Sequence, residues 1–160
     1  MRIEKGITNP MLVGMMQLLK EEDTPERRDA FVQEIMRATF LSPVEIDPPP
    51  VMGEDGVKRI PSGSQISFPL LKSKEGDKYF MAFTDMDEFQ LYKKEENSNV
   101  FALKFDDYVA MLLKGSEAGQ KNEAVGIVIN PMNHNMILLK DAIANLMLAK
   151  LAKEQGISLK

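Results

Sequence analysis

A short apolar run that ends at an Asn-Pro pair constrains the fold of this chain more than any other segment. Residues 124–129, Ala-Val-Gly-Ile-Val-Ile, carry no polar side chain, and Asn130-Pro131 stops the run before Met132-Asn133-His134-Asn135. A run of this length that is closed by turn residues predicts a buried strand. The strand then delivers three amide side chains and the only histidine of the chain to one end of a sheet.

Composition indicates one globular domain over residues 1–160. The chain is 44% apolar and 28% charged, which is ordinary for a globular protein. It has no cysteine, and this excludes disulfides, thiolate catalysis and Cys-ligated metal sites. The net charge of −4 is spread along the chain and weighs against binding to nucleic acid. The N-terminus lacks a secretory pattern and no apolar run is long enough for a bilayer, so we expect a cytoplasmic protein without membrane contact.

Capping residues and hydrophobic periodicity predict the helices. Asn9-Pro10 and Thr24-Pro25 each combine a capping residue with a proline suited to the first helical turn, which predicts an N-terminal helical pair. Residues 1–23 are expected to form a helical extension of the domain. Further helices are expected over residues 84–93, 106–115 and 141–155. In the last of these, the apolar residues expected on one face, the side that an amphipathic helix turns toward the core, are Ile143, Ala144, Met147, Leu148 and Leu151.

The expected strands mix a hairpin with crossover connections. They cover residues 39–44, 65–71, 78–83, 99–104, 124–129 and 136–139, with the second and third paired antiparallel. Residues 45–63, rich in proline and glycine, predict a surface loop. The order of elements indicates an α+β fold, a single domain in which helices cover a mixed β-sheet of about five to six strands.

The polar residues after the 124–129 strand are the first candidate ligand site. Asn130, Asn133, His134 and Asn135 would lie at the end of a central strand, where α/β sheets commonly bind ligands. Asn and Pro are also preferred turn residues, and a purely structural turn is the favoured interpretation. One histidine without HExxH spacing does not make a zinc site or a serine hydrolase triad, so we assign no metal, no cofactor and no catalytic residue.

A cluster of acids follows the strand expected at residues 78–83. Asp85, Asp87 and Glu88 lie within one turn, where carboxylates could hold a divalent cation or act as an acid and base pair. The favoured interpretation is structural, because Thr84 and Asp87 have capping spacing and acids in a first turn offset the helix dipole.

Methionine is the one unusual feature of the composition. Met11, Met15 and Met16 belong to the first helix, and the chain has 12 methionines in total. Because methionine is flexible and polarizable, these three are candidate contacts for a protein partner or a second copy of the chain. The alternative, which we favour, is a helix buried in its own core.

Three motifs, in their order along the chain, resemble the N-terminal domain of the enhanced-serine-sensitivity (SseB) family. They are Thr39-Phe40-Leu41-Ser42-Pro43-Val44, Phe83-Thr84-Asp85 before Phe89, and Gly126-Ile127-Val128-Ile129-Asn130-Pro131. The resemblance covers about residues 31–151. It implies a bacterial cytoplasmic α and β domain that is described by a serine-sensitivity phenotype, and it supplies no catalytic residues. We therefore expect a non-enzymatic binding or interaction module; the alternative is an amino-acid-related small-molecule sensor or enzyme that uses residues 130–135.

Overall fold

The computed structural model describes residues 6–93, 99–114 and 124–156 of the chain. These residues form an α+β fold in which helices α1 and α2 pack against each other, and this confirms the expected fold class and N-terminal helical pair. The helices are α1 (Pro10–Glu21), α2 (Pro25–Arg37), α3 (Met86–Tyr92), α4 (Phe105–Lys114) and α5 (Lys140–Glu154). The expected helix stop at Gly115 lies outside the described residues.

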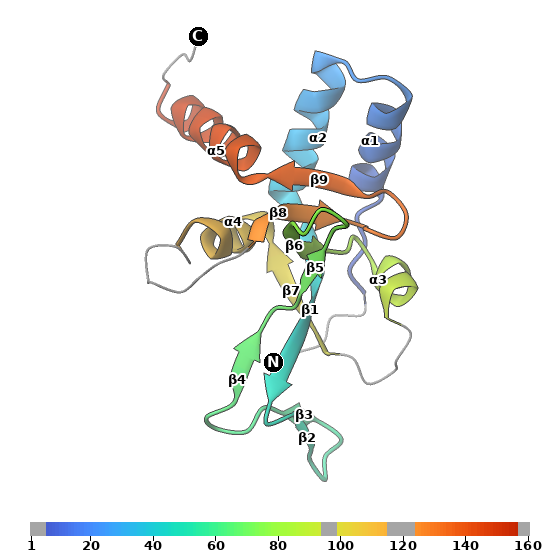
Figure 1. Ribbon diagram of the computed structural model, residues 1–160, viewed down its shortest axis with the longest axis vertical. Helices are drawn as coiled ribbons and strands as arrows, with labels where there is room; N and C mark the ends of the chain where they lie inside the picture. The colour runs from blue at the N-terminus through green and yellow to red at the C-terminus, as the bar shows by residue number, and fades with distance from the viewer. Residues whose placement is uncertain (1–5, 94–98, 115–123, 157–160) are drawn as a thin grey trace.

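The strands are distributed among three small sheets (Figure 1). The largest is mixed, in the order β5 (Leu70–Lys72), β6 (Lys78–Ala82), β8 (Ala124–Ile129) and β9 (Met136–Leu139), with β6 and β8 parallel. An antiparallel sheet has the order β4 (Gln65–Ser67), β1 (Thr39–Asp47) and β7 (Asn99–Lys104), and β2 (Val51–Met52) pairs with β3 (Lys58–Arg59). A single antiparallel bridge between Leu41 and Phe83 connects the two larger sheets.

Two expected strand boundaries differ from the observed ones because of proline. The strand expected at residues 65–71 is interrupted at Phe68-Pro69, and its two halves, β4 and β5, pair with different strands. Proline has no N–H for a ladder, so an interruption at this point is expected. β1 continues past Ser42-Pro43 to Asp47, because β4 pairs with it only from Glu45 onward and leaves one side of Pro43 unpaired. The 45–63 segment therefore holds the end of β1 and the small β2–β3 hairpin.

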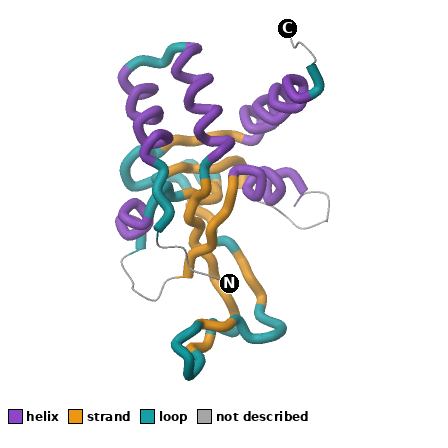
Figure 2. The backbone as a smooth tube through the Cα atoms, turned by 180° about the vertical axis from the view of Figure 1, so that it is seen from behind, coloured by secondary structure: helices purple, strands orange, loops and turns teal. Residues whose placement is uncertain are grey.

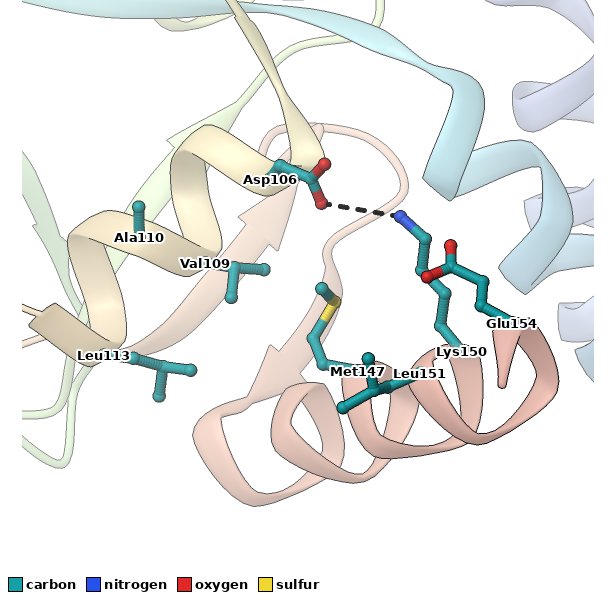
Figure 3. A pocket seen from close by; sticks show the side chains of 8 residues that line it. All are labelled: Asp106, Val109, Ala110, Leu113, Met147, Lys150, Leu151 and Glu154. Carbon is teal, nitrogen blue, oxygen red and sulfur yellow. Dashed lines mark ion pairs between the residues drawn. The ribbon is translucent and has the colours of Figure 1, made fainter. Parts of the chain in front are cut away.

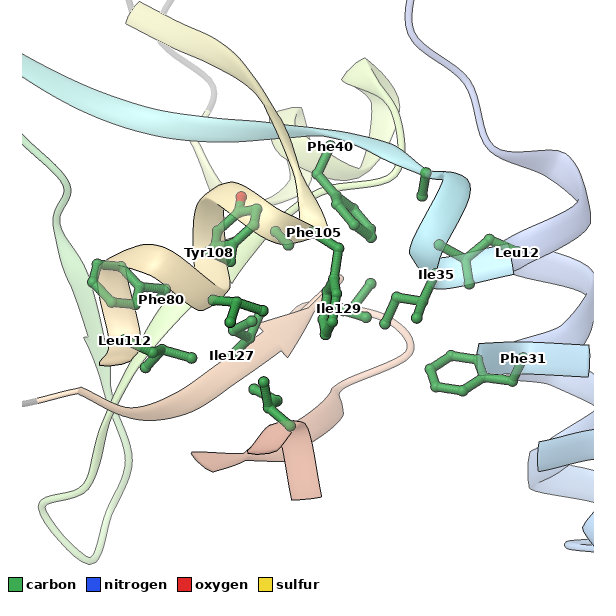
Figure 4. Close-up of a cluster of buried hydrophobic side chains, with 14 of the residues drawn as sticks. Leu12, Phe31, Ile35, Phe40, Phe80, Phe105, Tyr108, Leu112, Ile127 and Ile129 are labelled. Carbon is green, nitrogen blue, oxygen red and sulfur yellow. The ribbon is translucent and has the colours of Figure 1, made fainter. Parts of the chain in front are cut away.

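The mixed sheet is buried on both faces. Successive residues of β6 alternate between two clusters, with Phe80 and Ala82 in one and Tyr79 and Met81 in the other. The larger cluster receives side chains from α1, α2, α4 and α5 (Figure 4). The smaller cluster receives Phe89 of α3. Four helices, with α1 and α2 side by side (Figures 1 and 2), thus contribute to the core on one face, whereas α3 packs on the other. The antiparallel sheet contributes Phe40 to the larger cluster and Leu41 and Val100 to the smaller one.

The three methionines of α1 do not share one surface. Met16 is fully buried in the larger cluster, and Met15 is half-buried against it. Only Met11, with 66% of its surface exposed, is accessible to a partner. Met16 therefore lies on the helix face that packs into the core, in line with the favoured interpretation, and Met11 stays a candidate contact for a partner.

Tyr108 of α4 provides a test of the core through its pH dependence. The side chain is completely buried, and its hydroxyl donates a hydrogen bond to the Met81 carbonyl at 2.9 Å. Burial raises the pKa of the Tyr108 phenol above its ordinary value. A raised pKa means that the stabilising contribution of the neutral phenol is complete below about pH 10 and is lost as pH rises further.

We expect Tyr108→Phe to lower the free energy of unfolding at pH 7 by about 1–2 kcal/mol, since a buried carbonyl loses its donor. The variant should also lose less stability than the wild type between pH 9 and pH 11. Urea denaturation at several pH values measures both effects. An identical alkaline loss in the two proteins would contradict this account of Tyr108.

Candidate functional site

Asn130, the first residue after β8, is the centre of a buried polar cluster. It is 1% exposed and adopts a left-handed backbone conformation with φ of 49°. Its side-chain Oδ1 accepts the Thr84 N–H at 3.0 Å, and its Nδ2 donates to Thr84 Oγ1 at 2.9 Å. Its backbone N–H donates to the Ala82 carbonyl at 2.9 Å. Asn130 therefore ties the end of β8 to the segment between β6 and α3.

The Thr84 N–H also determines how Asn130 faces His134. Because an N–H group can only donate, the atom of Asn130 opposite it must be the amide oxygen. Asn130 Nδ2 then faces His134 Nδ1 at 3.1 Å, so Nδ1 accepts and the ring proton lies on Nε2. His134 is 7% exposed, which means that this imidazole takes part in the internal hydrogen bonding of the turn.

Glu88 of α3 completes the cluster, but it is poorly satisfied. Its Oε1 is a buried oxygen without a hydrogen-bond partner among the described residues, and it lies 3.5 Å from His134 Nδ1. Its Oε2 accepts only a long bond of 3.4 Å from Asn133 Nδ2. A buried carboxylate with one unpaired oxygen is costly to fold.

Asp85, and not Thr84, caps α3. Asp85 Oδ1 accepts the Glu88 N–H at 2.9 Å, while its Oδ2 accepts the Thr84 hydroxyl at 2.9 Å. The capping residue therefore lies one position later in the sequence than expected, at Asp85 in place of Thr84. Thr84 instead belongs to the polar cluster through its hydrogen bonds with Asn130. Its carbonyl also accepts a hydrogen bond from the Asn9 side-chain amide at 2.8 Å. Asn9 makes no side-chain cap for α1, although the helix begins at the expected Pro10.

The structure brings two of the four candidate ligand residues into this cluster and leaves two at its surface. Asn130 and His134 are buried, whereas Asn133 and Asn135 are exposed. Asn135 shares the left-handed conformation, with φ of 48°. Within the described ranges, no three His, Asp or Glu side chains are placed to hold a metal ion. The arrangement fixes a turn to a helix, and internal hydrogen bonds occupy the side-chain amide of Asn130, whereas Glu88 Oε1 is left unpaired.

We expect Glu88→Gln to raise the free energy of unfolding by about 1 kcal/mol, because it removes a buried charge with an unpaired oxygen. Asp87→Asn is the matched control, since Asp87 lies in the same first turn but is exposed. The free energy of unfolding of that control should fall by about a few tenths of a kcal/mol, because an acidic charge near the positive end of the helix dipole is removed. Thermal and urea denaturation measure both variants; a marked loss of stability in Glu88→Gln would show that the carboxylate is satisfied.

Helix α5 presents a second candidate site, on the surface. Its apolar residues occupy nearly every direction around the axis, a pattern typical of buried helices. However, only Ile143 and Ala152 are buried, and Leu148 and Leu151 are 59% and 50% exposed. The expectation that Leu148 and Leu151 lie with Ile143 on a core-facing stripe is therefore wrong.

Clefts lie on both sides of α5. The cleft toward α4 has a volume of about 330 Å³ and is crossed by an ion pair of 3.9 Å between Lys150 and Asp106 (Figure 3). Its apolar walls are formed by Val109, Leu113, Met147 and Leu151.

The cleft toward α2 is larger, about 600 Å³, and has an apolar floor with charged residues beside it. The floor includes Val32, Met36 and Leu146, and the charged lining residues are Asp29, Arg37, Lys150 and Lys153. Clefts of this size, lined by apolar and charged side chains, are typical of binding sites.

The fold and the two sites define a small α+β domain with a structural polar cluster and an exposed apolar helix. The chain matches the family model described as the SseB protein N-terminal domain over residues 12–145, and it belongs to this family. The matched region begins within α1. No curated protein and no solved structure shows significant similarity to the chain. Among the described residues, no helix is both long and apolar enough to cross a membrane.

Proposed function

We propose that this chain is a non-enzymatic protein-interaction module that binds its partner through α5 and the clefts beside it. One observation carries the proposal: α5 is apolar in almost every direction, yet most of its apolar side chains are exposed or half-buried. Exposed contiguous apolar surface is unusual for a protein that has no partner. The two clefts would receive apolar side chains of the partner, in the manner of helix-in-groove recognition.

The absence of a catalytic arrangement in the polar cluster supports the same proposal. The side-chain oxygen of Asn130 is hydrogen-bonded to Thr84, and its side-chain nitrogen to Thr84 and His134. His134 is itself buried. A nucleophile or base in this position would have its polar atoms engaged in hydrogen bonds with neighbouring residues and would not be free to meet a substrate. The cluster is better suited to hold the β8–β9 turn and α3 in fixed positions, so that β9 leads into α5 at a defined place.

Affinity capture followed by reconstitution tests the proposal. The wild-type chain, Leu151→Glu and Met11→Glu are each used as bait, and any retained protein is purified and titrated against all three. We expect Leu151→Glu to weaken binding at least tenfold and Met11→Glu, a change at a more exposed position on α1, to leave it unchanged. Loss of binding with Met11→Glu alone would place the surface on α1 and overturn the proposal.

A second candidate function is small-molecule sensing through residues 130–135, and the unpaired Glu88 oxygen is the observation that favours it. Glu88 hydrogen-bonds the exposed Asn133, and among the described residues its Oε1 is the one buried side-chain oxygen without a partner. A thermal-shift screen of amino acids and related metabolites, repeated with Asn133→Ala and His134→Ala, separates this function from the first. A ligand whose shift disappears in both variants would support it, and a screen without any shift would contradict it.

A further inference from the structure

We propose that His134 is a pH-dependent switch, which exchanges a hydrogen bond with Asn130 for an ion pair with Glu88 when its imidazole takes up a proton. Two distances at one ring nitrogen support the switch. His134 Nδ1 lies 3.1 Å from Asn130 Nδ2, which is a donor. It also lies 3.5 Å from Glu88 Oε1, an acceptor that has no hydrogen-bond partner among the described residues. The switch belongs to the buried polar cluster and is independent of the surface on α5.

One ring nitrogen can serve only one of these two neighbours at a time. An unprotonated Nδ1 accepts the Asn130 amide and has no proton to offer Glu88, whereas a protonated Nδ1 can only donate. Asn130 cannot adapt by turning its amide over, because its Oδ1 accepts the Thr84 N–H at 3.0 Å. A charged His134 must therefore release Asn130 and donate to Glu88.

The two states differ in which polar group lacks a partner. In the neutral state, Glu88 Oε1 is a buried oxygen without a donor. In the charged state, this oxygen gains a charge-assisted hydrogen bond, which is roughly twice as strong as a neutral one. Asn130 Nδ2 still donates to Thr84 Oγ1 at 2.9 Å, so the exchange leaves that nitrogen with an acceptor.

The surroundings confine the effect to this pair. His134 and Glu88 are 7% and 8% exposed, so solvent ions screen their attraction only weakly. Among the described residues, Glu88 is the one titratable side chain in contact with the imidazole. The other acids in this part of the chain are engaged elsewhere, because Asp85 caps α3 and Asp87 is exposed.

The switch changes what the β8–β9 turn is attached to. A neutral His134 bonds to Asn130 of its own turn, and a charged His134 bonds to Glu88 of α3. Imidazole is the side chain that ordinarily changes its charge between about pH 5 and pH 8. Mild acidification should therefore strengthen the connection between this turn and α3.

Nitrogen NMR of the imidazole tests the switch directly. The chain has one histidine, so the signals of its ring belong to His134 without further assignment. We expect a proton on Nε2 alone at about pH 8 and protons on both nitrogens at about pH 5. Glu88→Gln should move this transition to lower pH, and Asp87→Asn, the matched control at an exposed acid of the same turn, should leave it in place. An unprotonated Nδ1 at pH 5, or one transition pH for wild type and Glu88→Gln, would overturn the proposal.

Urea denaturation gives a second readout with a change of sign. Glu88→Gln should be more stable than the wild type at about pH 7.5, where the unpaired carboxylate is a cost, and less stable at about pH 5.5. The reason is that the folded wild type holds the proton of His134 more tightly than the folded variant does, so its relative stability rises as pH falls. In a His134→Gln background, the effect of Glu88→Gln should be the same at both pH values. If Glu88→Gln had the same sign of effect at both pH values in the wild-type background, the switch would be refuted, and the NMR titration decides the matter even if His134→Gln fails to fold.

Discussion

Asn130→Ala is expected to lower the free energy of unfolding by about 4 kcal/mol, the largest single effect that the structure predicts. The buried Thr84 N–H would lose its acceptor, which costs roughly 1–3 kcal/mol. An alanine at φ of 49° adds backbone strain of about 1 kcal/mol or more. His134 would also lose the Asn130 amide as its donor. Urea denaturation of the two proteins measures the difference.

Two further variants separate these causes. Asn130→Gly relieves the backbone strain but still leaves the Thr84 N–H without an acceptor, so its free energy of unfolding should fall by about 2–3 kcal/mol. Asn135 has the same left-handed backbone, but it is exposed and its side chain makes no hydrogen bond to the described residues. Asn135→Ala should therefore lower the free energy of unfolding by only about 1 kcal/mol. If Asn130→Ala proved no more harmful than Asn135→Ala, the cluster would not hold β8 to α3.

Gly126→Ala is expected to lower the free energy of unfolding by about 3 kcal/mol through overpacking between β8 and β9. A Cβ at this position would overlap the Leu138 carbonyl oxygen and lie 3.0 Å from the Leu139 Cα. Both are backbone atoms, which cannot turn away as a side chain would. β9 would have to shift, and because β9 runs directly into α5, the start of that helix would shift with it.

Gly14→Ala is the matched control for this effect. Gly14 lies inside α1, and a Cβ there would meet no atom within 4 Å. The same substitution should therefore raise the free energy of unfolding by about 0.5–1 kcal/mol through helix propensity. Chemical denaturation of both variants checks the pair, and a Gly126→Ala protein as stable as the wild type would contradict the close approach of β9.

The sequence predicted the local elements well because their signals are local. Residues 99–104 and 124–129 have the alternation or apolar continuity of strands, and both are strands with these same bounds. Thr24-Pro25 begins α2 where expected, and Thr24 accepts the Arg27 N–H as a cap. The distribution of strands among three sheets depends on long-range pairing, such as the Leu41–Phe83 bridge, and the local pattern does not contain it.

The candidate site was predicted only in part for the same reason. The Asn130 to Asn135 turn could be found from Asn-Pro, but its partners Thr84 and Glu88 lie more than 40 positions away in the sequence. The first turn of α3 and the β8–β9 turn therefore looked like separate motifs, each with its own structural explanation. Their contact shows that both belong to one cluster.

The exposed character of α5 was missed because spacing alone does not show which face meets the core. Ile143, Leu148 and Leu151 are all apolar, yet only Ile143 is buried. An apolar helix at the edge of a fold has the same sequence pattern as one in its centre.

Hydrogen exchange along the wild-type chain tests the central claim that α5 is the recognition surface. The exchange is measured with mass spectrometry for the chain alone at low concentration and for the chain saturated with its partner, whether a second copy or another protein. The account predicts slower exchange in peptides covering residues 144–152 and no change over residues 130–135. Protection of residues 130–135 with α5 unchanged would contradict it.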